Sequence, residues 1–103
     1  MDGIDLQKRR REHIRWLVLR ALDNARPIGF PENPLLEIVR AFYEDASRHE
    51  LRRELDYLED RGLIAIAERH TGHWRAELQR HGVDIVEYAI ECEPGIARPP
   101  KGL

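Results

Sequence analysis

The segment Ser47–Ile64, which reads SRHELRRELDYLEDRGLI, decides the fold of this chain. It begins with Ser47 and Glu50 in the S-x-x-E spacing of a capping box, in which each side chain satisfies a free amide at the start of a helix. Gly62, near its close, is a residue type that commonly ends helices. In between, three leucines at helical spacing share one face: Leu51, Leu55 and Leu58. We therefore expect a short, strongly capped helix with a leucine face.

The preceding stretch predicts a second helix. Asn33 can cap free amides and Pro34 has no amide to lose at the first helical position, so together they mark a helix start. This helix is expected to run to about Tyr43, and the polar turn Glu44–Ala46 follows it. Its inward side chains would be Leu35, Ile38, Val39 and Phe42. Two helices joined by a short turn form a candidate helix-turn-helix unit.

The N-terminal stretch predicts a longer amphipathic helix over about Leu6–Ala25. Asp5 is the expected N-cap, and Pro27 stops the helix. An apolar stripe runs along it at helical spacing: Ile14, Leu17, Val18, Ala21, Leu22 and Ala25. Trp16 and Leu19 lie off this stripe. The helix is therefore either buried at the centre of the core or in contact with a second copy of the chain.

Downstream of Gly62 the apolar period changes from that of a helix to that of a strand. Leu63–Ala67 is short, apolar and partly β-branched, and apolar residues alternate with polar ones in His73–Gln79. We interpret these two segments as a β-hairpin. Trp74 is expected in the core, because a buried indole is more common in a small domain than an exposed stacking platform.

A last helix is expected from about Arg80 to Glu91, with the inward residues Val83, Val86, Ala89 and Ile90. The residues that follow are rich in proline and glycine, which predicts an extended tail without packed structure. The chain therefore divides into one domain at 1–93 and an extended, Pro-rich C-terminal tail at 94–103. The expected fold class is mainly α with a small β-hairpin, an α+β arrangement of three helices, the hairpin and a C-terminal helix.

The composition narrows the class of protein. A chain of 103 residues is long enough for one domain, and its 42% hydrophobic and 35% charged residues are typical of a soluble, charge-rich globular protein. No apolar run approaches the length of a membrane span, and Met1–Ile4 does not begin a signal peptide. The single Cys92 allows no internal disulfide. These features favour a cytoplasmic protein without a membrane partner.

The sequence carries no recognisable catalytic or metal-binding motif. It lacks a Gly-rich phosphate loop, a nucleophile elbow and an H-E-x-x-H pair. His70 and His73 are three residues apart, but structural zinc usually needs four converging ligands, and the chain has one cysteine. We therefore expect a binding or assembly module rather than an enzyme, with neither a metal nor another cofactor.

Charge is unevenly distributed along the chain, although the net charge is only −2. Residues 1–26 hold seven basic and four acidic groups, whereas residues 27–62 hold five basic and nine acidic groups. Most of the N-terminal excess lies in one run, Lys8, Arg9, Arg10 and Arg11. Such a run is either the solvated face of a helix or a patch that contacts nucleic-acid phosphates.

The order of three helices, a hairpin and a helix resembles the winged helix-turn-helix superfamily, with a leucine-rich third helix that closes on Asp60–Ile64. The segment Ser47–Ile64 carries most of the resemblance, which covers about residues 6–91. In that family the third helix is the recognition helix, the hairpin is the wing, and a helix after the wing often serves dimerisation. The resemblance implies DNA binding, while winged helices also serve as protein-binding and structural modules.

A narrower resemblance is to small winged-helix proteins of Mu-like bacteriophages and prophages. It is carried by Leu55–Ile64, by Gly82–Glu87 and by the ending Pro94–Pro99. This chain departs from that pattern before the last helix, where it has Gln79 in place of an expected threonine cap. The resemblance implies a phage or prophage protein in a bacterial cytoplasm that acts in transcription regulation or in DNA handling.

If the capped helix enters the major groove, its first turns would meet DNA opposite the leucine face. The candidate DNA contacts there are Ser47, Arg48, His49, Arg52 and Arg53. In the wing, His73 and Arg75 could lie along a groove or a phosphate strand, and the basic run Lys8–Arg11 would lie on phosphates. The alternative is a solvated surface on which Arg52 pairs with Asp56 at i, i+4 spacing.

Double-stranded DNA is the first expected partner, bound by a homodimer through the N-terminal helix and the last helix, which would set two half-sites. The alternative is a non-enzymatic assembly or adaptor protein whose winged helix binds a protein partner. The acidic middle segment and the near-neutral total charge favour this alternative.

Overall fold

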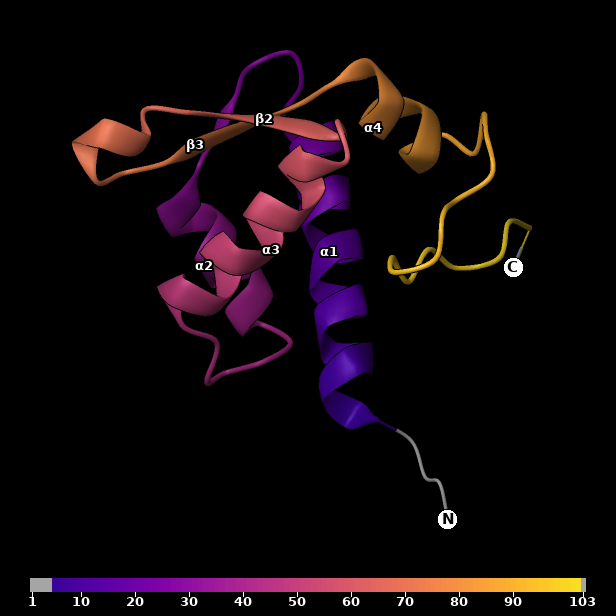
Figure 1. Ribbon diagram of the computed structural model, residues 1–103, viewed down its shortest axis with the longest axis horizontal. Coiled ribbons are helices and arrows are strands. Elements are labelled where there is room, and N and C mark those ends of the chain that lie inside the picture. The colour runs from indigo at the N-terminus through magenta and orange to yellow at the C-terminus, as the bar shows by residue number, and fades with distance from the viewer. Residues whose placement is uncertain (1–4, 103) are drawn as a thin grey trace.

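Four α-helices and a small three-stranded antiparallel sheet make up the α+β fold of the computed structural model, which describes residues 5–102 (Figure 1). In chain order the elements are α1 (Leu6–Ala25), β1 (Phe30–Pro31), α2 (Glu32–Arg40), α3 (Arg48–Asp60), β2 (Ile64–Ala67), a 3-10 turn (Arg69–Thr71), β3 (Arg75–Leu78) and α4 (Arg80–Val86). No helix within residues 5–102 has the length and the apolar character needed to cross a membrane.

Helix α1 is the long central helix. In Figure 1, α2 and α3 lie on one side of it, and α4 lies on the other side with residues 94–102, which we call the C-terminal segment. Its predicted bounds and its cap are confirmed, since the Asp5 side chain accepts a hydrogen bond from the amide of Lys8 at 3.0 Å. Trp16 and Leu19 are 5% and 0% exposed, and both belong to the chain's own core. The core interpretation of α1 is therefore confirmed, and these two side chains are not available to a second copy.

Helix α2 begins and ends earlier than the sequence suggested. It starts at Glu32 with Pro31 at the cap position, so Asn33 lies inside the first turn rather than at the cap. It ends at Arg40, and Phe42 lies beyond it with 57% of its surface exposed instead of on the inward face. The buried residues of this helix are Glu32, Leu35, Leu36 and Val39.

Helix α3 confirms the leucine face and most of the capping prediction. The Ser47 side chain accepts a hydrogen bond from the amide of Glu50 at 3.0 Å. The carboxylate of Glu50 reaches Arg10 on α1, so only the serine half of the capping box forms as predicted. Gly62 ends the turn after α3 at φ 74°, a left-handed conformation that glycine adopts without a steric penalty. The buried face consists of Leu51, Glu54, Leu55 and Leu58.

The predicted hairpin is present as β2 and β3, with Ile66 opposite Ala76. The sequence did not predict the third strand, β1, which pairs antiparallel with β3 and gives the order β1-β3-β2. Strand β1 contains only Phe30 and Pro31, and two residues with a proline give no period that could be recognised.

Helix α4 covers one end of the core over only seven residues and stops at Val86, well before the expected Glu91. Its buried side chain is Ile85, whereas the expected inward residues Ala89 and Ile90 lie beyond the helix and are exposed. Gly82 allows α4 to pack closely on the start of the hairpin, because a Cβ there would lie 2.3 Å from the carbonyl oxygen of Leu63.

The C-terminal segment has no helix or strand, but it is packed, in contrast to the unpacked tail expected from its composition. Ile96 is buried in the core, and the amide of Ala97 donates to the carbonyl of Glu12 on α1 at 3.1 Å. Arg98 donates to the carbonyls of Ile85 and Ile90 at 3.0 Å each. The residues after Pro94 therefore pack along α1, on the side of the molecule where α4 lies (Figure 1).

Candidate nucleic-acid interface

The N-terminal half of α3 presents basic side chains to solvent. Arg48 and His49 are exposed, and the side chain of Arg53 is 59% exposed. Arg48 donates to the neutral side-chain oxygen of Asn33 at 2.8 Å, and Arg53 lies 3.7 Å from the buried carboxylate of Glu54. Ser47 begins this surface as the cap, with its hydroxyl oxygen occupied by the amide of Glu50.

Three acidic residues of α3, Glu54, Asp56 and Glu59, are held by basic partners. Glu54 is buried and pairs with Arg15 of α1 at 2.7 Å. Asp56 and Glu59 both bind Arg69 at 2.7 Å. Arg69 lies in the hairpin of β2 and β3 with the turn between them, residues 64–78, which we call the wing. The predicted i, i+4 pair of Arg52 with Asp56 is wrong, because each side chain has a different partner. Asp60, the last residue of α3, is exposed at the end away from Arg48.

Burial acts against the negative charge of Glu59 and raises the pKa of its carboxyl group. Hydrogen bonds from the amide of Ile66 and from Arg69 outweigh that effect, so the pKa of Glu59 lies below its ordinary value. In the other direction, hydrogen bonds to Asp56 and Glu59 raise the pKa of Arg69. These ion pairs hold the wing against the second half of α3, with Glu59 and Arg69 both charged.

Arg52 turns away from the outer face of α3 and joins three segments of the chain. Its guanidinium group donates through Nε to Glu32 of α2 at 2.8 Å and through Nη2 to the carbonyl of Gly72 in the wing at 2.8 Å. The same group lies 4.6 Å from the centre of the Trp74 ring. We call the set Glu32, Arg52 and Trp74 the wing clamp.

Glu32 supplies the buried charge of the wing clamp and is 2% exposed. One carboxylate oxygen accepts the amide of Trp74 at 3.1 Å, and the amide of Glu32 donates to the carbonyl of Trp74 at 2.9 Å. Burial raises the pKa of Glu32, but the hydrogen bonds from Arg52 and Trp74 outweigh it, and the pKa lies below its ordinary value.

The wing tip contributes two exposed imidazoles and a packed indole. His70 and His73 are both exposed. Trp74 is half-buried against the core, and a second guanidinium group, that of Arg69, lies 4.2 Å from its ring centre. The structure thus places Trp74 between the core and two arginines, in partial agreement with the expected core position.

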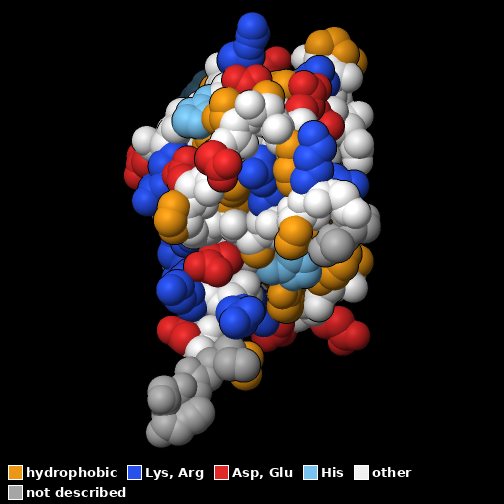
Figure 2. Space-filling view, turned by 90° about the vertical axis from the view of Figure 1, so that its right-hand side faces the viewer, with side chains coloured by type: hydrophobic (Ala, Val, Ile, Leu, Met, Phe, Trp, Pro, Cys, Tyr) orange, Lys and Arg blue, Asp and Glu red, His pale blue; other side chains and the backbone are white. Residues whose placement is uncertain are grey.

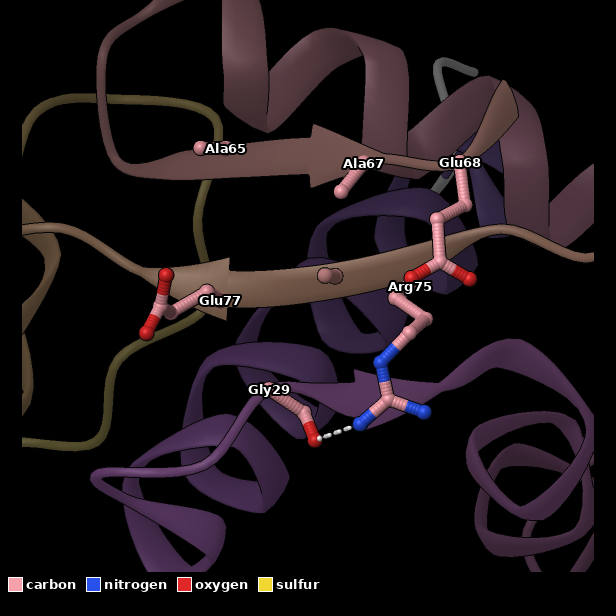
Figure 3. Close-up of a pocket in the computed structure, with 7 residues that line it drawn as sticks. Gly29, Ala65, Ala67, Glu68, Arg75 and Glu77 are labelled. Atoms are coloured by element: carbon pink, nitrogen blue, oxygen red, sulfur yellow. Dashed lines mark hydrogen bonds between the residues drawn. The ribbon is translucent and has the colours of Figure 1, made fainter. Parts of the chain in front are cut away.

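Arg75 lies on the outer face of the sheet rather than at the wing tip. Its guanidinium group donates to the carbonyl of Gly29 at 2.6 Å (Figure 3). It borders a shallow hollow of about 190 Å³ whose small side chains include Ala65 and Ala67 of β2. This position separates Arg75 from the exposed arginines of α3.

The N-terminal basic run does not all project past the core. Arg10 binds Glu50 through two hydrogen bonds of 2.8 Å and Asp45 at 2.9 Å, and these partners raise its pKa. Lys8 and Arg9 are exposed, and Arg11 is half-buried. Figure 2 shows the face that carries α1 and the C-terminal segment, where basic and acidic side chains alternate instead of forming one patch.

A shallow groove of about 260 Å³ lies between α1 and α2. It is mostly apolar, and the exposed Phe42 stands among its lining residues. Arg20 is the charged residue among them. The full lining is Trp16, Leu17, Arg20, Ala21, Asn24, Ile38 and Phe42.

Sequence reasoning missed three charged residues that organise this region. The burial of Glu54 had a signal, since it lies on the same helical face as Leu51 and Leu58. The sequence signal for the burial of Arg15 was weaker, since Arg15 lies next to the apolar stripe of α1. Glu32 had none, because it precedes the expected start of its helix and its partner Arg52 is twenty residues away.

The described residues 5–102 contain no group of three or more His, Cys, Asp or Glu side chains that could hold a metal ion. Cys92 is half-buried, and burial raises the pKa of its thiol. In comparisons with known proteins, no family model matches the chain, and neither a curated protein nor a solved structure matches it.

Proposed function

We propose that the chain is a winged helix-turn-helix protein that binds double-stranded DNA through the first half of α3 and the wing. The order of α2, α3, β2 and β3, with the turn between the strands folded beside α3, supports this assignment. The resemblance to small proteins of Mu-like phages adds transcription regulation or phage DNA handling as the setting of the proposal.

The observation that carries the proposal is the contrast between the two halves of α3. Its first half exposes Arg48, His49 and Arg53, while the carboxylates of Glu54, Asp56 and Glu59 are occupied by arginines. The acidic residues therefore do not face a phosphate backbone as uncompensated charges. An arginine at the start of such a helix can bind a guanine edge or a phosphate.

The proposed contact set differs from the one expected from the sequence. Arg48, His49 and Arg53 supply the contacts of α3, with Lys8, Arg9, His70 and His73 as neighbours that can meet phosphates. Arg10, Arg52 and Arg75 are occupied by internal partners, and we do not assign them DNA contacts.

The experiment is a titration of the protein against labelled random and genomic duplexes at several salt concentrations. Arg48→Ala with Arg53→Ala is expected to weaken binding and to lower the salt slope by about 2, because each lost phosphate contact lowers it by about 1. Arg26→Ala with Arg80→Ala is the matched control, since it removes the same charge from exposed positions outside α3 and the wing.

The proposal is contradicted if the unaltered protein fails to bind duplex DNA at low salt, or if both double variants lose affinity equally. Light scattering on the same samples measures dimerisation independently. A homodimer through α1 and the last helix cannot use Trp16 or Leu19, which are buried. Of the large apolar side chains that are exposed within residues 5–102, Leu6 lies on α1 and Ile90 lies just beyond α4.

The groove between α1 and α2 favours a second candidate function, an adaptor that binds a protein segment. The groove is apolar with Arg20 as its charged residue, so the partner that fits it is an apolar segment with a carboxylate placed to meet Arg20. A co-purified partner that is lost with Phe42→Asp and kept with Ile28→Asp would support this function, because Ile28 is a similarly exposed apolar residue outside the groove. Retention of that partner by both variants would contradict it.

A further inference from the structure

We propose that Arg52 is a positioning residue that fixes the wing against α3, so that the two elements meet DNA as one rigid surface. This inference rests on the proposed function, because it assigns a role within the same interface. It also changes the role of Arg52, which by sequence position alone is a candidate base or phosphate contact on α3.

Two of the three guanidinium nitrogens of Arg52 donate hydrogen bonds inside the protein. Nε and Nη2 both bind the carboxylate of Glu32, and Nη2 also donates to the carbonyl of Gly72. A guanidinium group in such a two-pronged contact is held in one orientation, because both the distance and the plane of the group are fixed. The side chain of Arg52 is 26% exposed, whereas that of Arg53 beside it is 59% exposed.

The partners of Arg52 belong to different parts of the interface. Glu32 is the first residue of α2 and is itself bound to both the amide and the carbonyl of Trp74. Gly72 closes the 3-10 turn of the wing at φ 82°. Arg52 therefore connects α2, α3 and the β3 side of the wing tip through one side chain.

The ring of Trp74 adds a stacking contact that depends on the same geometry. Arg52 and Arg69 both lie over this ring, at 4.6 and 4.2 Å from its centre. Arg69 is in turn bound to Asp56 and Glu59 on α3. A planar guanidinium group stacks on an indole and forms a two-pronged contact at the same time, which a lysine ammonium group cannot do.

A wing held in this way is ordered before DNA binds, so binding removes little further conformational freedom from it. Ordering a loop or side chain at an interface weakens affinity, so a preordered wing increases it. If Arg52 is a positioning residue, its loss lowers affinity while the number of phosphate contacts, and therefore the salt slope, stays the same.

The test compares Arg52→Lys with Arg53→Lys in the DNA titration. Lysine keeps the charge but loses the two-pronged contact. We expect Arg52→Lys to weaken binding about tenfold with an unchanged salt slope, and Arg53→Lys to retain nearly all affinity if its role is a phosphate contact. Retention of full affinity by Arg52→Lys, or a reduced salt slope, would overturn the positioning role.

Hydrogen exchange in the DNA-free protein separates this inference from the proposed function. The amide of Glu32 donates to the carbonyl of Trp74, and the amide of Trp74 donates to the carboxylate of Glu32. In Arg52→Lys we expect both amides to exchange faster, while the amides of α1 keep their rates. In Arg53→Lys the same amides keep their rates. Unchanged exchange in Arg52→Lys overturns the clamp even if the protein binds DNA, and absence of DNA binding with faster exchange rejects the function alone.

Discussion

Two clusters flank α3 with nearly the same composition. In the wing clamp, Arg52 binds the buried Glu32, donates to the carbonyl of Gly72 and lies over Trp74. On the other side of α3, Arg15 binds the buried Glu54, donates to the carbonyl of Gly95 at 2.8 Å and lies 3.4 Å from the ring centre of Tyr57. We call this second set, Arg15, Glu54 and Tyr57, the tail clamp, because it holds the C-terminal segment.

The two clamps differ in how completely their carboxylates are satisfied. Both oxygens of Glu32 accept hydrogen bonds, whereas Oε2 of Glu54 is buried without a hydrogen-bond partner. Glu54 is also 1% exposed and lies within the leucine face of α3. Removing the partner of a buried charge lowers the free energy of unfolding more when that charge keeps no other hydrogen-bond partner. The comparison therefore predicts that the tail clamp determines stability and that the wing clamp determines the shape of the candidate interface.

The largest effect is expected from breaking the tail clamp on one side. Arg15→Met removes the hydrogen-bonded partner of the buried Glu54 and leaves only the more distant Arg53 near its charge. We expect it to lower the free energy of unfolding by about 3–5 kcal/mol. Urea unfolding followed by circular dichroism measures the change. The double variant Arg15→Met with Glu54→Leu is the control, since replacing both charges with apolar groups is expected to recover most of the loss. A loss below about 1 kcal/mol in the single variant would show that the pair is not the key contact.

An intermediate effect, dependent on pH, is expected from Glu32→Gln in the wing clamp. The pKa of Glu32 is lower in the folded chain than its ordinary value of 4.5, so its charge stabilises the fold above that pH. This stabilisation is lost as the pH falls through the folded value. At neutral pH we expect the variant to lose about 1.5–3 kcal/mol, the range for hydrogen bonds to charged groups.

The measurement for Glu32→Gln is the free energy of unfolding between pH 7 and pH 3 in both proteins. The difference between them should shrink at the acidic end, because protonation removes the same charge from the unaltered protein. Glu37→Gln, at a carboxylate whose side chain is 75% exposed, is expected to leave the acid dependence almost unchanged. A difference that stays constant over the whole range would contradict the assignment of the charge to Glu32.

The smallest effects are expected from substitutions of the two glycines whose carbonyl oxygens accept hydrogen bonds from Arg52 and Arg15. These substitutions compare the packing of the two clamps. Gly72 and Gly95 both have positive φ, but a Cβ at Gly72 meets nothing within 4 Å, whereas one at Gly95 lies 2.2 Å from the hydroxyl oxygen of Tyr57. Gly72→Ala is expected to cost about 1–2 kcal/mol from the backbone alone. Gly95→Ala should cost more when both variants are measured by urea unfolding. Equal losses would argue against close packing of the C-terminal segment on Tyr57.

Local signals predicted the helices and the hairpin, because each depends on residues close in sequence. The bounds of α1 and the cap at Ser47 are of this kind, as are the leucine face of α3 and the hairpin of β2 and β3. The predicted start of α2 was wrong because Asn33 is a good N-cap residue by local sequence. In the structure Pro31 occupies the cap position, and Glu32 begins the helix, where its carboxylate binds Arg52 and Trp74.

The interface was less predictable because its charges are paired over long distances in sequence. Arg10 meets Glu50 forty residues away, and Arg69 meets Asp56 thirteen away. No spacing rule relates such residues, so the sequence could show that arginines were present but not which of them remain exposed. The packing of the tail escaped prediction for the same reason, because Ile96 is buried in a core built from distant helices and Ala97 binds the carbonyl of Glu12 on α1.

The hydrogen bond from Arg15 to Gly95 joins residues eighty apart in a chain of 103, so the loop that it closes contains more than three quarters of the chain. Contacts of such long sequence separation form late in folding, after helices and hairpins that need only nearby partners. The C-terminal segment has no regular structure to stabilise it before it docks. We therefore expect its amides to open in a local transition, below the free energy of global unfolding, while the core of α1 and α3 stays closed.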